Sequence, residues 1–161
     1  MKEIPLTRGK VALVDDEDYE ALSGHKWCAW RASENRTFYA ARRIKKRSVA
    51  MHRVILSLEQ GDSAVDHKNG DGLDNRKTNL RLATPSQNNM NKLGRRGSTS
   101  KYKGVSLCGG GSKKWRARIK HDSLGRFENE VEAALAYDEK AQQIFGEFAK
   151  LNFGKEKRGA L

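Results

Sequence analysis

Residues 65–70 read Val-Asp-His-Lys-Asn-Gly and decide how the central part of the chain is interpreted. An aspartate and a histidine stand side by side there, and two asparagines, Asn79 and Asn88, follow His67 at intervals of 12 and 21 residues. A histidine base and hard oxygen donors at such spacing are typical of a metal-dependent phosphodiesterase. The same residues also fit an ordinary surface loop, because Asn, Asp and Gly supply turns. The rest of the chain has to decide between these two interpretations.

The composition points to an anionic polymer as partner. The chain has 161 residues and a formal net charge of +12. Its cations are clustered, with eight Lys and Arg against one acid in residues 31–53 and five against none in residues 92–104. Only 37% of the residues are hydrophobic and 32% are charged, which favours small units in series over one large core. These features predict nucleic-acid binding.

Other classes of protein are disfavoured by what the sequence lacks. No apolar run approaches the length of a membrane span, and residues 1–5 lack the apolar core of a signal peptide. Cys28 and Cys108 are far apart and form no Cys-x-x-Cys pair, which excludes a cysteine-rich zinc site and gives no disulfide framework. We therefore expect a cytoplasmic protein that is not secreted and that has neither a membrane nor a small molecule as partner.

Residues 1–49 are expected to form a β-rich part. Apolar and β-branched runs predict strands at residues 10–14, 25–32 and 37–44. A short helix is expected after the first strand, capped by Asp15 or Asp16 and ending at Gly24. Met51 begins an apolar stripe at helical spacing, which predicts another short helix. The aromatic residues of this part are expected to pack in the core and the sheet, namely Trp27, Trp30, Phe38 and Tyr39.

Residues 65–92 combine two short strands, a polar loop and a helix. The strands are predicted at residues 65–67 and 79–83. Thr84 is a favourable N-cap, Pro85 fits the first helical position, and Gln87 completes a capping box. Asn88 is therefore expected on the first turn of this helix.

Residues 93–99 predict a flexible basic linker between the motif region and a second module. Three strands are predicted in this module, at residues 102–107, at residues 115–120 and in a segment ending near Phe127. A capping box of Asn129 and Glu132 opens a helix that ends at Gly146. Residues 154–161 are expected to form a tail.

His67, Asp66 and Asn88 provide the chemistry that phosphodiester hydrolysis needs. Histidine is the side chain best suited to take a proton near neutral pH. The carboxylate of Asp66 and the amide oxygen of Asn88 are hard donors suited to Mg²⁺. Neighbours on a regular strand point to opposite faces, so Asp66 and His67 can serve one site only if the strand ends or distorts between them. The turn-forming residues just downstream favour such a distortion.

Residues 50–92 resemble an HNH endonuclease of the phage homing type, a family with the ββα-metal fold. The shared elements are an Asp-His-x-x-Gly segment, an Asn-Leu-Arg segment and the late asparagine Asn88, which stands where the family name has a histidine. The resemblance implies that His67 is the general base and that Asn79 holds His67 and the loop in place. It also implies that Asp66 and Asn88 bind one divalent ion per site, Mg²⁺ or Mn²⁺.

The segment around His52 and Arg53 resembles the helix that precedes the motif in such enzymes. On that basis we interpret His52 as structural or phosphate-contacting rather than catalytic, and Arg53 as a DNA contact. Arg95 and Arg96 in the basic linker are expected to bind DNA as well.

Residues 100–153 resemble the Apetala-two/ERF (ethylene-response-factor) DNA-binding domain. The match includes Tyr-Lys-Gly-Val, Trp-Arg-Ala-Arg-Ile and Leu-Gly-Arg-Phe segments. In that family a three-stranded sheet enters the major groove, and its side chains contact bases and phosphates. By position, the expected contacts are Lys103, Trp115, Arg116, Arg118 and Lys120. Ser106 and Cys108 depart from the family pattern, so base specificity cannot be carried over, and simple sheet packing stays an alternative for Trp115.

Together these features predict an α+β chain built in series. An HNH endonuclease domain at residues 1–92 comprises a small β-rich N-terminal part, 1–49, and the ββα-metal motif region, 50–92. The linker 93–99 leads to an Apetala-two/ERF-like domain at 100–153, a three-stranded antiparallel sheet packed on one helix, and to the tail 154–161.

The favoured function is that of a DNA endonuclease, homing-type or phage-encoded, acting on double-stranded DNA as a monomer or homodimer in a bacterial cell or phage-infected host. The alternative is a non-catalytic, sequence-specific DNA-binding protein, a regulator with a degenerate HNH fold. A scaffold or RNA-binding protein is a third interpretation, supported by charge alone.

Overall fold

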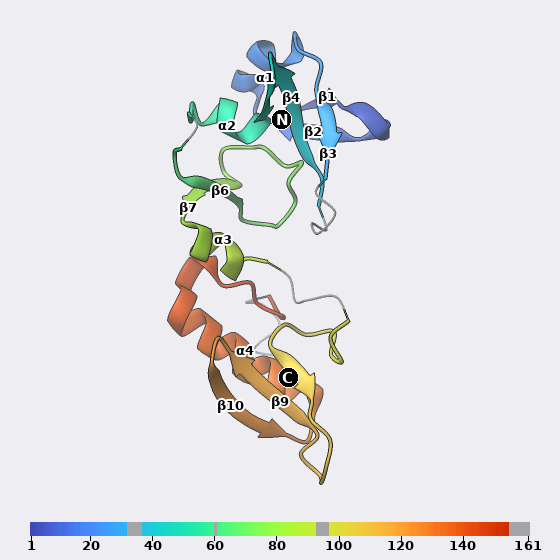
Figure 1. The fold of residues 1–161 in the computed structure, drawn as a ribbon, viewed down its shortest axis with the longest axis vertical. Helices are drawn as coiled ribbons and strands as arrows, with labels where there is room; N and C mark the ends of the chain where they lie inside the picture. The colour runs from blue at the N-terminus through green and yellow to red at the C-terminus, as the bar shows by residue number, and fades with distance from the viewer. Residues whose placement is uncertain (32–36, 60, 93–96, 155–161) are drawn as a thin grey trace. The chain divides into compact units, whose positions relative to one another are not determined.

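The computed structural model describes residues 1–31, 37–59, 61–92 and 97–154. The chain forms two compact units, Met1–Asn88 (unit 1) and Asn89–Leu161 (unit 2). Both units combine small antiparallel sheets with helices, so the predicted α+β class is confirmed (Figure 1). No helix in these described ranges is long and apolar enough to cross a membrane.

The first part of unit 1 contains two small sheets. One pairs β1 (Lys2–Pro5) with β2 (Val11–Val14), and the other has the order β3 (Cys28–Trp30), β4 (Tyr39–Ile44), β5 (Arg47–Ala50). A 3-10 turn (Thr7–Gly9), α1 (Asp16–Ser23) and α2 (Met51–Ile55) complete this part. β1 and β5 are additions to the prediction, since each is a short, largely polar strand without a clear alternation of apolar residues.

The core of unit 1 forms where these elements meet. Its buried members come from both sheets and both helices: Ile4, Leu6, Ala12, Val14, Leu22, Trp27, Ala29, Ala40 and Met51. The indole N–H of Trp27 donates to the Leu22 carbonyl at 2.9 Å, which satisfies its polar atom inside the core. Trp30 is the exception among the aromatic residues expected to be packed, because 54% of its surface is exposed.

The motif region of unit 1 consists of β6 (Ala64–His67), β7 (Leu80–Ala83) and α3 (Pro85–Met90). The predicted capping box is present: the Gln87 N–H donates to Thr84 Oγ1 at 3.2 Å, and the Thr84 N–H donates to Gln87 Oε1 at 2.8 Å. These two bonds fix the start of α3 and therefore the position of Asn88 on its first turns.

The polar loop between β6 and β7 is bonded to the N-terminal part of the chain. Its Leu73 carbonyl accepts from the Leu13 N–H at 2.9 Å, and its Asn75 N–H donates to the Leu13 carbonyl at 2.8 Å. The Lys77 N–H donates to the Asp15 carboxylate at 2.7 Å. The Asp15 side chain, expected to cap α1, makes no cap hydrogen bond and binds this loop instead.

Unit 2 is a three-stranded sheet with one long helix. The strand order is β10 (Asp122–Phe127), β9 (Trp115–Ile119), β8 (Val105–Leu107), and α4 (Glu130–Phe145) lies along the sheet (Figure 1). Asn129 caps α4 through a 2.8 Å bond from the Val131 N–H, and a 3-10 turn (Gly146–Phe148) follows the helix. Three strands and one helix were expected here, and both the strands and the helix lie close to the predicted ranges.

One buried carboxylate closes the end of unit 2. Asp138 on α4 is fully buried and accepts hydrogen bonds from the Asn152 N–H at 2.8 Å and the Phe153 N–H at 2.8 Å. Asn152 in turn accepts from the Lys103 N–H at 2.7 Å. The segment after the helix is thereby bound to α4 and to the start of the sheet.

Candidate functional site

His67 is the last residue of β6 and lies in a cluster of aromatic rings. Only 5% of its surface is exposed. The centroid of its ring is 5.1 Å from that of His52 on α2 and 5.7 Å from that of Tyr39 on β4, and the rings of Tyr39 and His52 are 6.1 Å apart. Three segments distant in sequence therefore meet around the histidine that the sequence singles out.

This burial keeps both histidines neutral. Burial lowers the pKa of His67 below its usual value, while Asn75 and the carboxylates of Asp66, Asp71 and Asp74 oppose that shift. Burial, together with the neighbouring His67 and Arg53, lowers the pKa of His52 to about 3. A neutral imidazole is the form that can accept a proton, so His67 is in the state that a general base requires.

Asp66 is buried next to His67 and is bound by an arginine. Its Oδ2 accepts from Arg81 Nε at 2.8 Å and from Arg81 Nη2 at 2.6 Å. The two residues face each other in the β6–β7 register, which continues to the pair of His67 and Leu80 without a shift. The expected distortion between Asp66 and His67 is therefore not found in the strand pairing. Neighbours on a regular strand leave it on opposite faces, so the pairing by itself does not direct Asp66 and His67 to one point.

The Asn79 side chain forms hydrogen bonds that hold the loop following His67. Its Nδ2 donates to the Asp74 carbonyl at 2.8 Å and to Asn69 Oδ1 at 3.1 Å, and its Oδ1 accepts from the Asn69 N–H at 3.0 Å. Asp74, also buried, is paired with Arg76 through two bonds of 2.7 Å. The amide of Asn79 is thus placed to hold the loop, as the resemblance implied, although a role in catalysis stays a prediction.

The residues expected to bind a metal ion are Asp66 and Asn88. Asn88 is half-buried on α3, and its N–H donates to the Thr84 carbonyl at 3.0 Å. Within the described part of the chain there is no group of three or more His, Cys, Asp or Glu side chains that could hold an ion. A carboxylate and an amide oxygen are nevertheless the donor types of a Mg²⁺ site that leaves most positions to water and phosphate. The donor set fits such an ion, provided that Arg81 moves away from Asp66.

Three side chains at the site were not among the predicted site residues. Arg81 lies opposite Asp66, and its place in the Asn-Leu-Arg segment, two residues after Asn79, was a usable signal. Asn75 is fully buried against the loop, next to the predicted turn residues. Tyr39 is 28 residues from His67, and no local sequence pattern could have placed it there.

The predicted DNA contacts lie in different surroundings. The Arg53 guanidinium donates hydrogen bonds to the backbone carbonyls of Ser63 and Glu59. Burial and the neighbouring Lys150 lower the pKa of Lys103 to about 8, which leaves this amine less strongly charged than an exposed one. Arg95 and Arg96 lie outside the described residues. Arg53 and Lys103 therefore have structural partners, and their contacts with DNA stay predictions.

The sheet of unit 2 separates the remaining candidates by face. Trp115 lies with the buried Ala117 on the side that packs on α4, where it joins the hydrophobic core. Arg116 and Arg118 alternate with them and lie on the opposite, solvent-facing side. Arg126, which was not predicted, is the cross-strand partner of Arg116 and is exposed on the same side.

Lys120 lies in the turn between β9 and β10. Its Nζ is 5.2 Å from the centroid of the Phe145 ring, over the core of unit 2. The open face of this sheet therefore presents arginines, while its tryptophan packs into the core and exposed Lys120 lies over the Phe145 ring.

The comparisons with known proteins concern the region just described. Residues 49–90 match the family model described as HNH endonuclease. The central segment is therefore similar to HNH endonuclease domains. A curated protein of Acanthamoeba polyphaga mimivirus, described as an uncharacterized HNH endonuclease, is 29% identical over 153 residues, covering 90% of this chain and 76% of that protein. No solved structure matches the chain. The matched residues include α2, β6, the bonded loop, β7 and α3, among them both His52 and His67.

Proposed function

We propose that the protein is a DNA endonuclease that hydrolyses phosphodiester bonds at the HNH endonuclease domain, with His67 as the general base. The observation that carries this proposal is the position of His67 at the end of β6: it is buried and neutral, it lies within the residues that match the HNH family model, and it contacts His52 of the same match and Tyr39 of β4. The partner is double-stranded DNA, in keeping with the net charge of +12.

The chain's own residues account for the proton transfer. Neutral His67 takes the proton of a water molecule, and the hydroxide formed attacks the phosphate in line with the leaving 3′ oxygen, giving 5′-phosphate and 3′-hydroxyl ends. The nearby carboxylates of Asp66, Asp71 and Asp74 favour the imidazolium that this step creates. Asn79 holds the loop, so that His67 keeps its orientation throughout.

One divalent ion, Mg²⁺ or Mn²⁺, would be held by Asp66 and Asn88. When bound, it would supply Lewis-acid stabilisation of the charge that develops on the phosphate and the leaving oxygen. The Arg81 guanidinium would then release Asp66 and bind another anion. A phosphate of the bound DNA is the acceptor that the reaction itself provides.

Unit 2 would bind DNA through the open face of its sheet. Arg116, Arg118 and Arg126 on that face support an Apetala-two/ERF-like role, in which the sheet enters the major groove. An origin in a phage or a homing element, a cytoplasmic location, and action as a monomer or homodimer belong to the same proposal.

A second candidate function is a DNA-binding regulator with an inactive HNH endonuclease domain. The observation that favours it is the ion pair between Asp66 and Arg81, because a guanidinium on Asp66 competes with a metal ion. Both functions involve DNA binding, so cleavage has to distinguish them.

The test is incubation of supercoiled plasmid with the whole chain in Mg²⁺, Ca²⁺ or EDTA. We expect Mg²⁺-dependent nicking that falls about 100- to 10,000-fold in His67→Ala, the range typical of a lost general base. His25→Ala is the matched control, because His25 is exposed in the same unit and away from the ring cluster. Nicking that survives in His67→Ala would rule out His67 as the base. Duplex binding by the wild type without cleavage in any metal would favour the regulator.

A further inference from the structure

The hairpin of β4 and β5 carries cations that the site at His67 does not use. Its exposed cations are Arg43, Lys45, Lys46 and Arg47. Residues 39–50 contain no acid. The ion pairs found among the described residues do not include any of the four. These side chains therefore present uncompensated positive charge to solvent.

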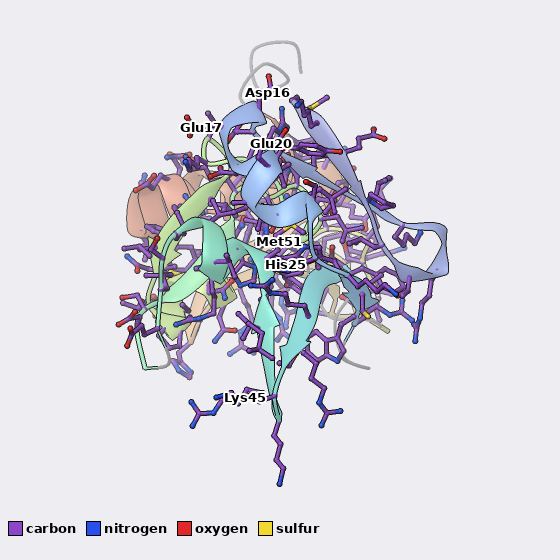
Figure 2. All side chains as sticks on the ribbon, turned by 90° about the horizontal axis from the view of Figure 1, so that it is seen from above. Asp16, Glu17, Glu20, His25, Lys45 and Met51 are labelled. Carbon is purple, nitrogen blue, oxygen red and sulfur yellow. The ribbon has the colours of Figure 1, made fainter. Side chains whose placement is uncertain are left out.

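A group of acids of unit 1 lies at a different place. Asp16, Glu17 and Glu20 lie on α1, where they pair with the N-terminal amino group, Lys77 and Lys2. In Figure 2, Lys45 extends from the tip of the hairpin, at the opposite end of the view from these three acids. Unit 1 thus has an acidic end that is internally paired and a basic end that is not. Such an asymmetry orients a protein towards a polyanion.

Lys45 also occupies a backbone position that lysine rarely adopts. It is the first of two turn residues between the paired residues Ile44 and Arg47, and its φ is +55°. Two-residue hairpin turns with positive φ favour Gly, Asn or Asp, because a β-carbon is crowded there. Strained backbone of this kind gathers at functional sites. A cation therefore stands at the hairpin tip where glycine would be the more stable choice.

The hairpin leads away from the site along one face of its sheet. β4 begins at Tyr39, whose ring lies 5.7 Å from that of His67. Exposed Trp30 pairs with Tyr39 in the sheet, and Arg43 follows on the same face four residues later. Lys45 is six residue steps along the extended chain from Tyr39, which corresponds to about 20 Å. Along duplex DNA this distance corresponds to about six base pairs.

We propose that the β4–β5 hairpin binds the phosphate backbone of duplex DNA about six base pairs from the phosphate cleaved at His67. This inference rests on the proposed function, because the distance along the DNA is counted from the phosphate cleaved at His67. Lys45 provides the contact at the tip, next to Lys46 in the same turn, and Arg43 on β4 and Arg47 on β5 extend the basic surface along the two strands.

Lys45→Gly tests this proposal, because it should move stability and DNA affinity in opposite directions. Glycine adopts the positive φ of this position without strain, so the substitution should raise the midpoint of thermal unfolding by about 2–5 °C. The same change should raise the Kd for a duplex, measured by anisotropy in EDTA, about fivefold near 0.1 M salt, and reduce the salt slope by about one. If Lys45→Gly gains stability but keeps the wild-type Kd, Lys45 does not contact DNA and the proposal is overturned.

Arg8→Gly is the matched control. Arg8 is an exposed cation of unit 1 with a φ of +64°, so its replacement relieves the same backbone conformation and removes the same charge. We expect its Kd to stay within about twofold of the wild type, since no hairpin contact is lost. Equal losses of affinity in the two variants would show a general effect of charge and overturn the hairpin assignment.

The footprint and the cleavage rate separate this proposal from the function on which it rests. Hydroxyl-radical protection about six base pairs from the nick should disappear in a variant with all four hairpin cations replaced by Ser or Gly. Cleavage by the wild type with no change in affinity or footprint in the variants would overturn the hairpin alone. A wild type that neither binds nor cleaves duplex DNA would overturn both proposals.

Discussion

Asp66 in unit 1 and Asp138 in unit 2 are both almost inaccessible to solvent, yet they are bound by different kinds of partner. Asp66 is held by the mobile end of a side chain, the Arg81 guanidinium. Asp138 is held by backbone N–H groups of Asn152 and Phe153, which cannot leave without unfolding their segment. A carboxylate bound by backbone is part of the architecture, whereas one bound by an arginine can exchange partners. The burial of a carboxylate alone does not reveal which of the two it is.

The surroundings of the two carboxylates differ in the same way. In unit 1, Asp66 is one of several buried polar side chains of the motif region, together with His67, Asp74, Asn75 and Asn79. In unit 2, the region near Asp138 is formed by apolar residues of α4 and the sheet, such as Ile119, Tyr137 and Ala141. Only the first environment offers several groups that can take up or give a proton or bind a cation. The predictions below test this contrast between an exchangeable and a fixed carboxylate.

The largest effect is expected for Asp66→Asn. The amide keeps the size of the side chain but loses the charge needed to bind a cation, so plasmid nicking should fall about 100- to 1000-fold, the range for loss of one preorganised charge-stabilising group. Nicking is measured under single-turnover conditions, with duplex affinity in EDTA as the check on folding. Asp138→Asn is the matched control and should nick at the wild-type rate. A fully active Asp66→Asn would show that Asp66 is not at the reaction centre.

Next in size is Asp138→Ala, which should lower the free energy of unfolding of unit 2 by about 3 kcal/mol. The change leaves the N–H groups of Asn152 and Phe153 buried without their acceptor. Hydrogen exchange of the whole chain measures the loss of amide protection in unit 2. The protection of unit 1, which should not change, is the internal control. A variant with unchanged protection at residues 152–153 would contradict the fixed role of this carboxylate.

A pH effect is expected in unit 1 because its buried histidines resist protonation. The folded-state pKa of His52, about 3, lies below its unfolded value of about 6.5, so the stability that neutral His52 provides is present above pH 6.5 and is lost as the pH falls. Between pH 6.5 and 5 the loss is about 2 kcal/mol. His52→Gln should remove this part of the acid sensitivity, as measured by urea unfolding at the two pH values. His121→Gln, an exposed histidine of unit 2, should leave the acid sensitivity unchanged.

The smallest effect is expected for Gly72→Ala. A β-carbon at Gly72 would lie 2.5 Å from the Phe38 carbonyl oxygen and 2.6 Å from the Tyr39 ring. Tyr39 would have to move away from His67, with a loss of about 1–2 kcal/mol in unit 1 and a slower cleavage rate. Gly24→Ala is the control, because no atom lies within 4 Å of its added carbon. Equal stability of the two variants would contradict this expectation, because it would show that Tyr39 can move aside without a loss of stability.

Local signals in the sequence were sufficient for much of the fold. The capping box at Thr84 and Gln87 and the Asn129 cap of α4 act over a few residues, and both helices begin where these residues predict. The long apolar pattern of α4 fixed its length in the same way. Short polar strands such as β5 depend on pairing with β4, and their own residues carry no comparable signal.

The candidate site was predicted only in part, for a related reason. His67, Asp66 and Asn79 stand in one short segment with recognisable spacing, and the structure places them around one loop. The partners that determine how they behave come from elsewhere: Tyr39 from another sheet and His52 from α2. The expected distortion between Asp66 and His67 is not found, because β6 pairs with β7 without a shift through both residues.

The bonds between the motif loop and β2 have a consequence for how the site is made during synthesis. The Lys77 N–H and the Asp15 carboxylate are 62 residues apart in sequence, and Leu13 binds residues 73 and 75 over a similar separation. A nascent chain therefore forms its N-terminal sheet well before the loop that completes the environment of His67. Closing such long loops is slow, so the histidine site is expected to mature late, after α3 has left the ribosome. A fragment cut at the limits of the HNH family match would lack these N-terminal partners and would fold without its loop in place.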